Sequence, residues 1–447
     1  MPDHSLLHEA RDVLPEAVRL RRRLHARPEV GLDLPFTQET VLTALADLPL
    51  TVATGSSTSS VVATLEGARP GPTVLLRGDM DALPMPEDTG LPYASEVDGT
   101  MHACGHDTHV AMLAGAAELL ASRRNDLAGR VVLMFQPGEE GHHGARFMLE
   151  EGLLDVGPLS DGSPSPVSGA FALHITSLFP SGTINLRGGT MMASSDTMRI
   201  VVRGRGGHAS APHQALDPIP VACEIVQAIQ TMVTRRVDVF DPGVITVAQI
   251  TAGTTSNVIP ETAVILGTIR AVSERTRSRL HGGVRRVAEG VGAAHEAVVE
   301  VDVELGYPVT INDLGYAGFA SAVATDLLGI GRVTSMPAPV MGAEDFSYVL
   351  QEVPGAIAFL GAAPPGVDPR RAAPNHSNRV LFDEDAMAAG IAMYTQMALA
   401  HLATGGAVPN QLRQISVSSA SKTTPIHAEK PNHTEKSEAD GRPPSAD

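Results

Sequence analysis

The segment Asp107–Ser122 reads DTHVAMLAGAAELLAS, and the segment Val131–Phe135 that follows it reads VVLMF. The first has the length and composition of a buried helix, and the second is a short apolar strand. Another such strand, Val74–Asp79 (VLLRGD), precedes them, and Arg11–Leu24 has the pattern of a charged helix. Strands that alternate with helices favour an α/β fold with a mostly parallel central sheet flanked by helices.

A different pattern begins at Asp196–Arg203 (DTMRIVVR), where apolar side chains alternate with period two. The residues after it predict a helix at 217–235, strands at 243–251 and 262–270, a helix at 274–291 and a strand at 297–305. The resulting β-α-β-β-α-β order is that of a ferredoxin-like α+β unit. The α/β pattern then resumes, with a strand at 356–360 and a helix at 383–402.

These patterns divide the chain into a catalytic domain and an insertion. We expect the first part of the catalytic domain at 1–186, the inserted domain at 187–303 and the second part of the catalytic domain at 304–404. Residues 405–447 are rich in Ser, Thr, Pro, Glu and Lys, with few large apolar side chains, which is typical of a disordered tail.

Composition narrows the class of protein. A net charge of −17, 3% aromatic residues and no tryptophan argue against binding of nucleic acid. No apolar run approaches the roughly 20 residues that cross a bilayer, so we expect no membrane segment. The two cysteines, Cys104 and Cys223, cannot form a disulfide framework, and the N-terminus does not resemble a signal peptide. A cytoplasmic protein is therefore expected.

Side chains of the types that bind metals recur near the ends of predicted strands. They are Cys104 and His106 in HACGHD, Glu139 and Glu140 in FQPGEEG, His174 in FALHI, and His376 in PNHSNR. Thiolate, imidazole and carboxylate together suit a borderline-soft divalent cation such as zinc. An additional carboxylate beside the ligands would serve as a base for activating water.

Each motif also has an ordinary structural explanation. Cys104 and His106 could be a buried thiol and a helix cap, Glu139–Glu140 a solvated turn, and His174 a hydrogen-bonded core histidine. His102 and His109 could equally serve as ligands. On extended backbone, Cys104 and His106 would face one ion, whereas Glu139 and Glu140 would point in opposite directions. The convergence of separate segments favours a metal site.

Taken together, the motifs along residues 15–403 resemble the dinuclear-metal aminoacylase/carboxypeptidase family. The similarity is closest to its amidohydrolase branch, which includes hippurate hydrolases, auxin-conjugate hydrolases and N-acetyl-diaminopimelate deacetylases. It rests on HACGHD, FQPGEEG, GGHASAPH, NVIP, GTIR and GAEDFSY. One departure is His25-Ala-Arg27-Pro28-Glu29, where Arg27 replaces a histidine that is usual in the family.

The resemblance implies two divalent cations per subunit, zinc or manganese, with cobalt or nickel also able to occupy such a site. Their implied ligands are Cys104, His106, Glu140, His174 and His376, with Cys104 as the bridging thiolate. Glu139 would be the general base. In the inserted domain, which would act as a lid and dimerisation unit, His208 would reach the active site of a partner subunit. Asn257 and Arg270 would contact the substrate, although Arg270 alone could be a surface strand residue.

The expected activity is hydrolysis of an N-acyl amino acid, such as an N-acetyl or N-benzoyl derivative, by metal-activated water. The expected partners are this small molecule and a second copy of the chain in a homodimer or higher homo-oligomer. A dipeptidase or carboxypeptidase of the same family is an alternative. A metal-binding dimer without turnover is another, but a binding protein has no need of the base Glu139.

Overall fold

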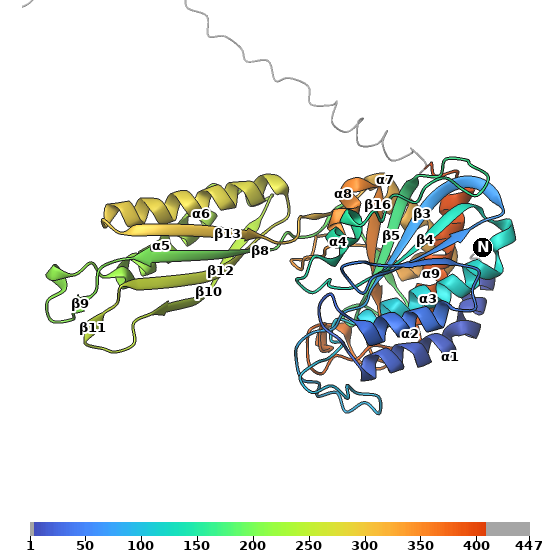
Figure 1. The fold of residues 1–447 in the computed structure, drawn as a ribbon, viewed down its shortest axis with the longest axis horizontal. Helices are drawn as coiled ribbons and strands as arrows, with labels where there is room; N and C mark the ends of the chain where they lie inside the picture. The colour runs from blue at the N-terminus through green and yellow to red at the C-terminus, as the bar shows by residue number, and fades with distance from the viewer. Residues whose placement is uncertain (1–3, 408–447) are drawn as a thin grey trace, which may run out of the picture. The chain divides into compact units, whose positions relative to one another are not determined.

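The computed structural model describes residues 4–407, and its main sheet is mostly parallel, as predicted (Figure 1). The sheet has eight strands in the order β1-β2-β4-β3-β5-β16-β6-β15. Neighbours are parallel at β4/β3, β3/β5, β5/β16 and β6/β15, and antiparallel elsewhere. The strands are β1 (Thr51–Thr54), β2 (Val61–Glu66), β3 (Arg69–Asp79), β4 (Ala128–Gln136), β5 (Val167–Thr176), β6 (Ile184–Leu186), β15 (Val333–Ser335) and β16 (Gly355–Gly361).

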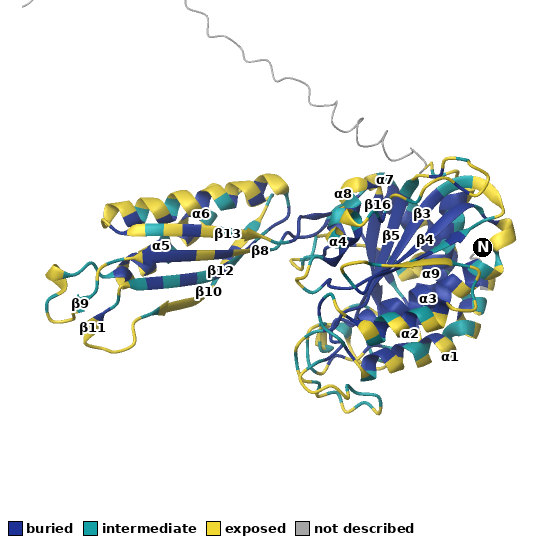
Figure 2. Ribbon diagram, in the orientation of Figure 1, coloured by how far each residue is buried: buried dark blue, intermediate teal, exposed yellow. Residues whose placement is uncertain are grey.

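Both faces of this sheet are buried (Figure 2), which explains why its central strands are continuous apolar runs. Leu76 and Leu133 belong to a core with one set of helices, whereas Leu75 and Val132 point into a second core. The first set comprises α1 (His4–Ala26), α2 (Pro35–Leu45), α3 (His106–Ser122), α7 (Leu314–Leu328) and α9 (Ala386–Ala403). The second core involves α4 (Gly144–Glu150) and α8 (Ser347–Glu352).

A second sheet has four antiparallel strands in the order β10-β12-β8-β13. Its elements follow the predicted β-α-β-β-α-β order along the chain. They are β8 (Asp196–Arg203), α5 (Pro218–Arg236), β10 (Gly243–Ala252), β12 (Thr262–Ala271), α6 (Glu274–Ala294) and β13 (Val298–Leu305). The two helices cover one face, where side chains such as Ile200 and Ile265 form a separate hydrophobic core.

Short elements complete the described part of the chain. Two-stranded pairs form between β9 (Gly207–His208) and β11 (Val258–Ile259), and between β7 (Gly189–Met192) and β14 (Thr310–Asn312). No helix within residues 4–407 is long and apolar enough to cross a membrane. The predicted disorder of 405–447 falls largely on residues 408–447, which lie outside the described residues.

Ile265 and Ile219 provide a matched test of the second core, because they lie on β12 and α5 of the same unit. Ile265 is fully buried, whereas Ile219 is 39% exposed. Replacing Ile265 with alanine should lower the free energy of unfolding by about 2–5 kcal/mol, since it leaves a cavity. Ile219→Ala should cost less than about 1 kcal/mol. Urea unfolding followed by circular dichroism measures both, and equal losses would contradict the assigned core.

Candidate metal centre

Cys104 and His106 flank a sharp turn at the start of α3. Gly105 has a φ of +92°, and a Cβ there would lie 2.4 Å from Cγ2 of Ile175. Glycine is therefore required at this position by conformation and by space. The extended backbone expected from the sequence is wrong here, because the chain turns at Gly105 and His106 is already the first residue of the helix.

Glu139 and Glu140 lie in a tight loop after β4. The carboxylate of Asp81 accepts hydrogen bonds from both backbone amides, Glu139 N at 2.9 Å and Glu140 N at 3.0 Å. The two side chains consequently do not diverge as they would on an extended strand. A carboxylate oxygen of each lies within 4.8 Å of a ring nitrogen of His106.

The predicted ligands form two groups that share Cys104. One group is Cys104, His106 and His174, and the other is Cys104, Glu140 and His376. The Cys104 sulfur lies 3.3 Å from Nε2 of His174 and 3.3 Å from Nε2 of His376. His376 Nε2 is also 3.2 Å from a Glu140 oxygen. A thiolate at the junction of two donor groups has the position needed to bridge two cations.

The chemistry of this donor set fits divalent cations. His106 Nε2 and Glu140 Oε1 are buried and make no hydrogen bond of acceptable geometry among the described residues, although buried polar atoms normally have one. Their neighbours at 3.2 Å are the Asp79 carboxylate and His376 Nε2. Burial raises the pKa of the Cys104 thiol, and the nearby carboxylates of Glu140 and Glu139 raise it further. A cation would satisfy the unpaired atoms and stabilise the thiolate.

Sequence reasoning missed the carboxylates of Asp79 and Asp81 in the segment GDMD, where Asp79 is the last residue of β3 and Asp81 follows it. Asp79 lies 3.2 Å from His106 Nε2 and 2.5 Å from His109 Nδ1. His109 Nε2 accepts a hydrogen bond from the backbone of Ile175 at 2.7 Å. Both ring nitrogens of His109 are thus engaged within the protein, which removes His109 from the candidate ligands. Polar residues directly after a buried strand were the available signal for Asp79 and Asp81.

His102 was the other alternative ligand, and it lies in none of the groups around Cys104. It is fully buried, and neither ring nitrogen has a hydrogen-bond partner among the described residues. Burial lowers the pKa of His102 to about 3, which keeps the ring neutral.

Arg77 lies behind the donor groups and is fully buried. Its guanidinium contacts Asp79 at 2.8 Å, Glu344 at 2.7 Å and Asp345 at 3.2 Å. Glu344 and Asp345 come from the GAEDFSY motif, and each has an oxygen within 4.8 Å of Glu139. Arg77 therefore compensates part of the negative charge gathered around Glu139.

The donor groups open into a cavity of about 660 Å³. Arg270 lines it and donates a hydrogen bond to the carbonyl oxygen of Met341 at 2.8 Å. Arg270 is half-buried and belongs to β12. His208 and Asn257, by contrast, are exposed and do not line the cavity.

His208 and Asn257 are neighbours of each other. β9 and β11 pair in antiparallel register, with His208 opposite Val258. The backbone amide of Ala209 donates to the Asn257 carbonyl oxygen at 3.1 Å. His208 Nδ1 is 2.7 Å from the hydroxyl of Ser210 in its own loop. Within one chain, the structure brings the two residues together but not to the donor groups.

Tyr307 holds the Glu139 loop in place, a role that no sequence motif indicated. Its hydroxyl donates to the carbonyl oxygen of Glu139 and accepts from the amide of Gly141 at 2.7 Å. Tyr307 follows β13, so the segment that leaves the second sheet contacts the backbone of the candidate base.

Fold and site together define a metal-dependent hydrolase. The chain belongs to the family described as Peptidase family M20/M25/M40, whose profile matches residues 75–400. It is therefore an enzyme that hydrolyses amide bonds, and the resemblance noted from the motifs is confirmed. The two donor groups and the dinuclear centre of a structural relative support two metal ions per chain.

Several relatives cover most of the chain. Thermostable carboxypeptidase 1 of Saccharolobus solfataricus is 37% identical over 88% of this chain and 98% of its own length. N-acetylcysteine deacetylase of Bacillus subtilis is 37% identical over 77% of this chain and 87% of its own. A solved dinuclear metal-binding peptidase of the M20 family from B. subtilis has a TM-score of 0.74 and 32% identity, covering 88% of this chain and 99% of that one.

Tyr307→Phe tests the support of the Glu139 loop, because it removes only the hydroxyl. We expect kcat for amide hydrolysis to fall by about ten- to a hundredfold, since small displacements of a catalytic group are costly. KM and metal content should change little. Steady-state kinetics and metal analysis measure these quantities.

Tyr316→Phe is the matched control, because the hydroxyl of Tyr316 is buried without a hydrogen-bond partner among residues 4–407. It should leave kcat unchanged. A Tyr307→Phe enzyme with the kcat of the control would refute the positioning role.

Proposed function

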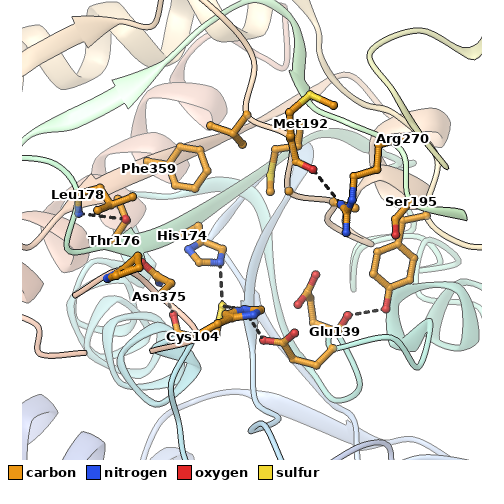
Figure 3. Close-up of a pocket in the computed structure, with 18 of the residues that line it drawn as sticks. Cys104, Glu139, His174, Thr176, Leu178, Met192, Ser195, Arg270, Phe359 and Asn375 are labelled. Carbon is orange, nitrogen blue, oxygen red and sulfur yellow. Dashed lines mark hydrogen bonds and ion pairs between the residues drawn. The ribbon is translucent and has the colours of Figure 1, made fainter. Parts of the chain in front are cut away.

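We propose that this protein is a metal-dependent amidohydrolase that cleaves N-acyl amino acids into a carboxylic acid and a free amino acid. One observation carries the proposal. Glu139, Arg270 and four of the five predicted ligands line one cavity, and the four ligands are Cys104, Glu140, His174 and His376. Figure 3 shows Cys104, Glu139, His174 and Arg270 around it.

We assign Cys104, His106, Glu140, His174 and His376 as the metal ligands, with Cys104 bridging. Zinc or manganese suits this mixture of sulfur, nitrogen and oxygen donors, and cobalt or nickel could also bind. When bound, divalent cations polarise a carbonyl group and lower the pKa of water. Asp81 would orient His106, because Nδ1 of His106 lies 2.8 Å from the Asp81 carbonyl oxygen and Nε2 is left to hold a cation.

Glu139 is the proton carrier in this proposal. Burial raises its pKa, and the neighbouring carboxylates of Glu344 and Glu140 raise it further, whereas bound cations act in the opposite direction. Glu139 takes a proton from the attacking water while the oxygen of that water forms a bond to the acyl carbon. The amide C–N bond then breaks, and Glu139 delivers the proton to the leaving amine.

Arg270 would bind the carboxylate of the amino acid. Within residues 4–407 the Arg270 guanidinium donates to the Met341 carbonyl oxygen and pairs with no carboxylate, so further donors of the guanidinium remain free. A guanidinium can grip a carboxylate through two parallel hydrogen bonds. Asn257 would add a further contact to the substrate.

His208 would complete the site from a second subunit and stabilise the oxyanion of the tetrahedral intermediate. Its exposure and its absence from the cavity of its own chain support this arrangement. β10 is an edge strand of the second sheet and exposes Val244 and Ile250. Such an edge is suited to pairing with another chain. We therefore propose that residues 187–303 form a lid and dimerisation domain, inserted between the catalytic parts 1–186 and 304–404.

A carboxypeptidase activity is the second candidate, and the identity to thermostable carboxypeptidase 1 favours it. Both reactions break an amide bond next to an amino acid that carries a free carboxylate. They differ in the group on the acyl side of that bond. This group is an aminoacyl residue in a carboxypeptidase substrate and a simple carboxylic acid in an N-acyl amino acid. Parallel assays with dipeptides and N-acyl amino acids separate them.

Glu139→Gln should retain both metal ions and lose about two to four orders of magnitude in kcat on N-acyl amino acids, since an amide cannot accept the proton. Cys104→Ala should instead lose metal, because the bridging donor is gone. Elemental analysis and amino-acid release measure the two variants. Unchanged turnover in the first would reject Glu139 as the base, and full metal content in the second would reject the bridging role of Cys104.

Mixed dimers test the role of His208. His208→Ala and Glu139→Gln homodimers should each be inactive, because one damaged residue falls in every site. A heterodimer that carries both substitutions, one in each subunit, keeps one site with Glu139 and the partner's His208 intact. Verified heterodimers should therefore recover up to about half of the wild-type activity per dimer, as follows from simple counting of sites. If verified heterodimers recovered no activity, that result would argue against a site shared between subunits.

A further inference from the structure

Leu178, Phe179 and Phe359 form one apolar wall of the cavity beside the donor groups, and Met192, Val340 and Met341 are further apolar lining residues. Leu178 and Phe179 follow β5, and Phe359 lies in β16 directly opposite His174 in the parallel register. Leu178 is 46% exposed although it is a large apolar side chain. An exposed apolar side chain at the mouth of a cavity is a surface that a ligand can cover.

The rings of this wall lead away from the metal-type residues in a row. The ring centres of His174 and Phe359 are 5.5 Å apart with a T-shaped arrangement, and those of Phe359 and Phe179 are 6.3 Å apart. Spacings of this kind are typical of favourable aromatic pairs, and a further ring could join the row.

Charge is distributed unevenly around the cavity. Among the lining residues, Arg270 is the only arginine or lysine. In Figure 3, Arg270 lies on one side of Cys104 and Glu139, whereas Leu178 and Phe359 lie on the other. A substrate with its carboxylate at Arg270 and its amide at Glu139 therefore extends its acyl group toward the apolar wall.

We propose that this wall selects a ring-sized apolar acyl group, such as benzoyl, over acetyl, with Phe179 as a specificity-determining residue. This inference rests on the proposed hydrolysis of N-acyl amino acids. Phe179 is the residue to vary because it is half-buried and its ring pairs with Phe359, whereas the ring of Phe359 packs directly on the predicted ligand His174. A benzoyl ring would bury apolar surface against the wall that an acetyl group leaves exposed.

The test compares N-benzoyl-alanine with N-acetyl-alanine on the metal-loaded enzyme. We expect kcat/KM to be at least about tenfold higher for the benzoyl compound, in line with the discrimination that apolar pockets achieve. Phe179→Ala should reduce this ratio by at least about fivefold. Phe147→Ala is the matched control, because Phe147 is also half-buried but does not line the cavity, and it should leave the ratio unchanged.

A second ratio shows which end of the substrate the wall contacts. The preference for N-acetyl-leucine over N-acetyl-alanine depends on the amino-acid side chain and should not change in Phe179→Ala. A shift in this ratio, with the benzoyl-to-acetyl ratio constant, would place the side chain rather than the acyl group at the wall and overturn the inference.

Binding provides a measurement that needs neither turnover nor a change in the wall. Calorimetry with the metal-loaded Glu139→Gln variant should show N-benzoyl-alanine bound at least about tenfold more tightly than N-acetyl-alanine. Equal affinities would overturn the inference. Tighter benzoyl binding without hydrolysis by the wild type would keep the selectivity of the wall and reject the proposed function. Hydrolysis of both compounds without a benzoyl preference would keep the proposed function and reject the selectivity of the wall.

Discussion

The structure depends on the compensation of negative charge that is buried at one edge of the main sheet. Asp79, Glu139, Glu344 and Asp345 are all buried there, near the buried guanidinium of Arg77. Buried carboxylates are costly unless they are paired or coordinate a cation. Arg77 pairs with the carboxylates of Asp79, Glu344 and Asp345, and the groups that share Cys104 include buried atoms that lack hydrogen bonds among the described residues. Divalent cations would supply the missing positive charge at that point.

Topology explains why residues so distant in sequence meet. The adjacent parallel strands β4, β3, β5 and β16 run in the same direction, so the segments after them collect at one edge. Asp79 and His174 lie at or near the ends of β3 and β5, and Glu139 and His376 come after β4 and β16. This is the position where open α/β sheets bind ligands. The same packing fixes details such as Gly105, where Ile175 leaves no room for a side chain.

The fold could be predicted closely, because long apolar runs and period-two alternation are local signals. Asp196–Arg203 was predicted as a strand and is β8, and the expected order of the second sheet was correct. The residue types of the metal centre could also be predicted, since Cys, His and Glu occur near the ends of predicted strands. Their local geometry was not, because the left-handed turn at Gly105 and the Asp81 bridge to Glu139 and Glu140 arise from tertiary contacts. The role of Tyr307 could not be predicted for the same reason, since its hydrogen-bond partners are backbone groups of a distant loop.

The two sides of the cavity are subject to different constraints, and this bears on how one family can include proteins named for carboxypeptidase and deacetylase activity. Donor residues such as Cys104 are buried and surrounded by partners, so few substitutions are compatible with their contacts. Leu178 and Phe179 lie after β5, in a loop that carries no donor residue. Side chains there can change size without disturbing the buried charges. Selectivity for the acyl side can thus vary while the hydrolytic chemistry stays the same.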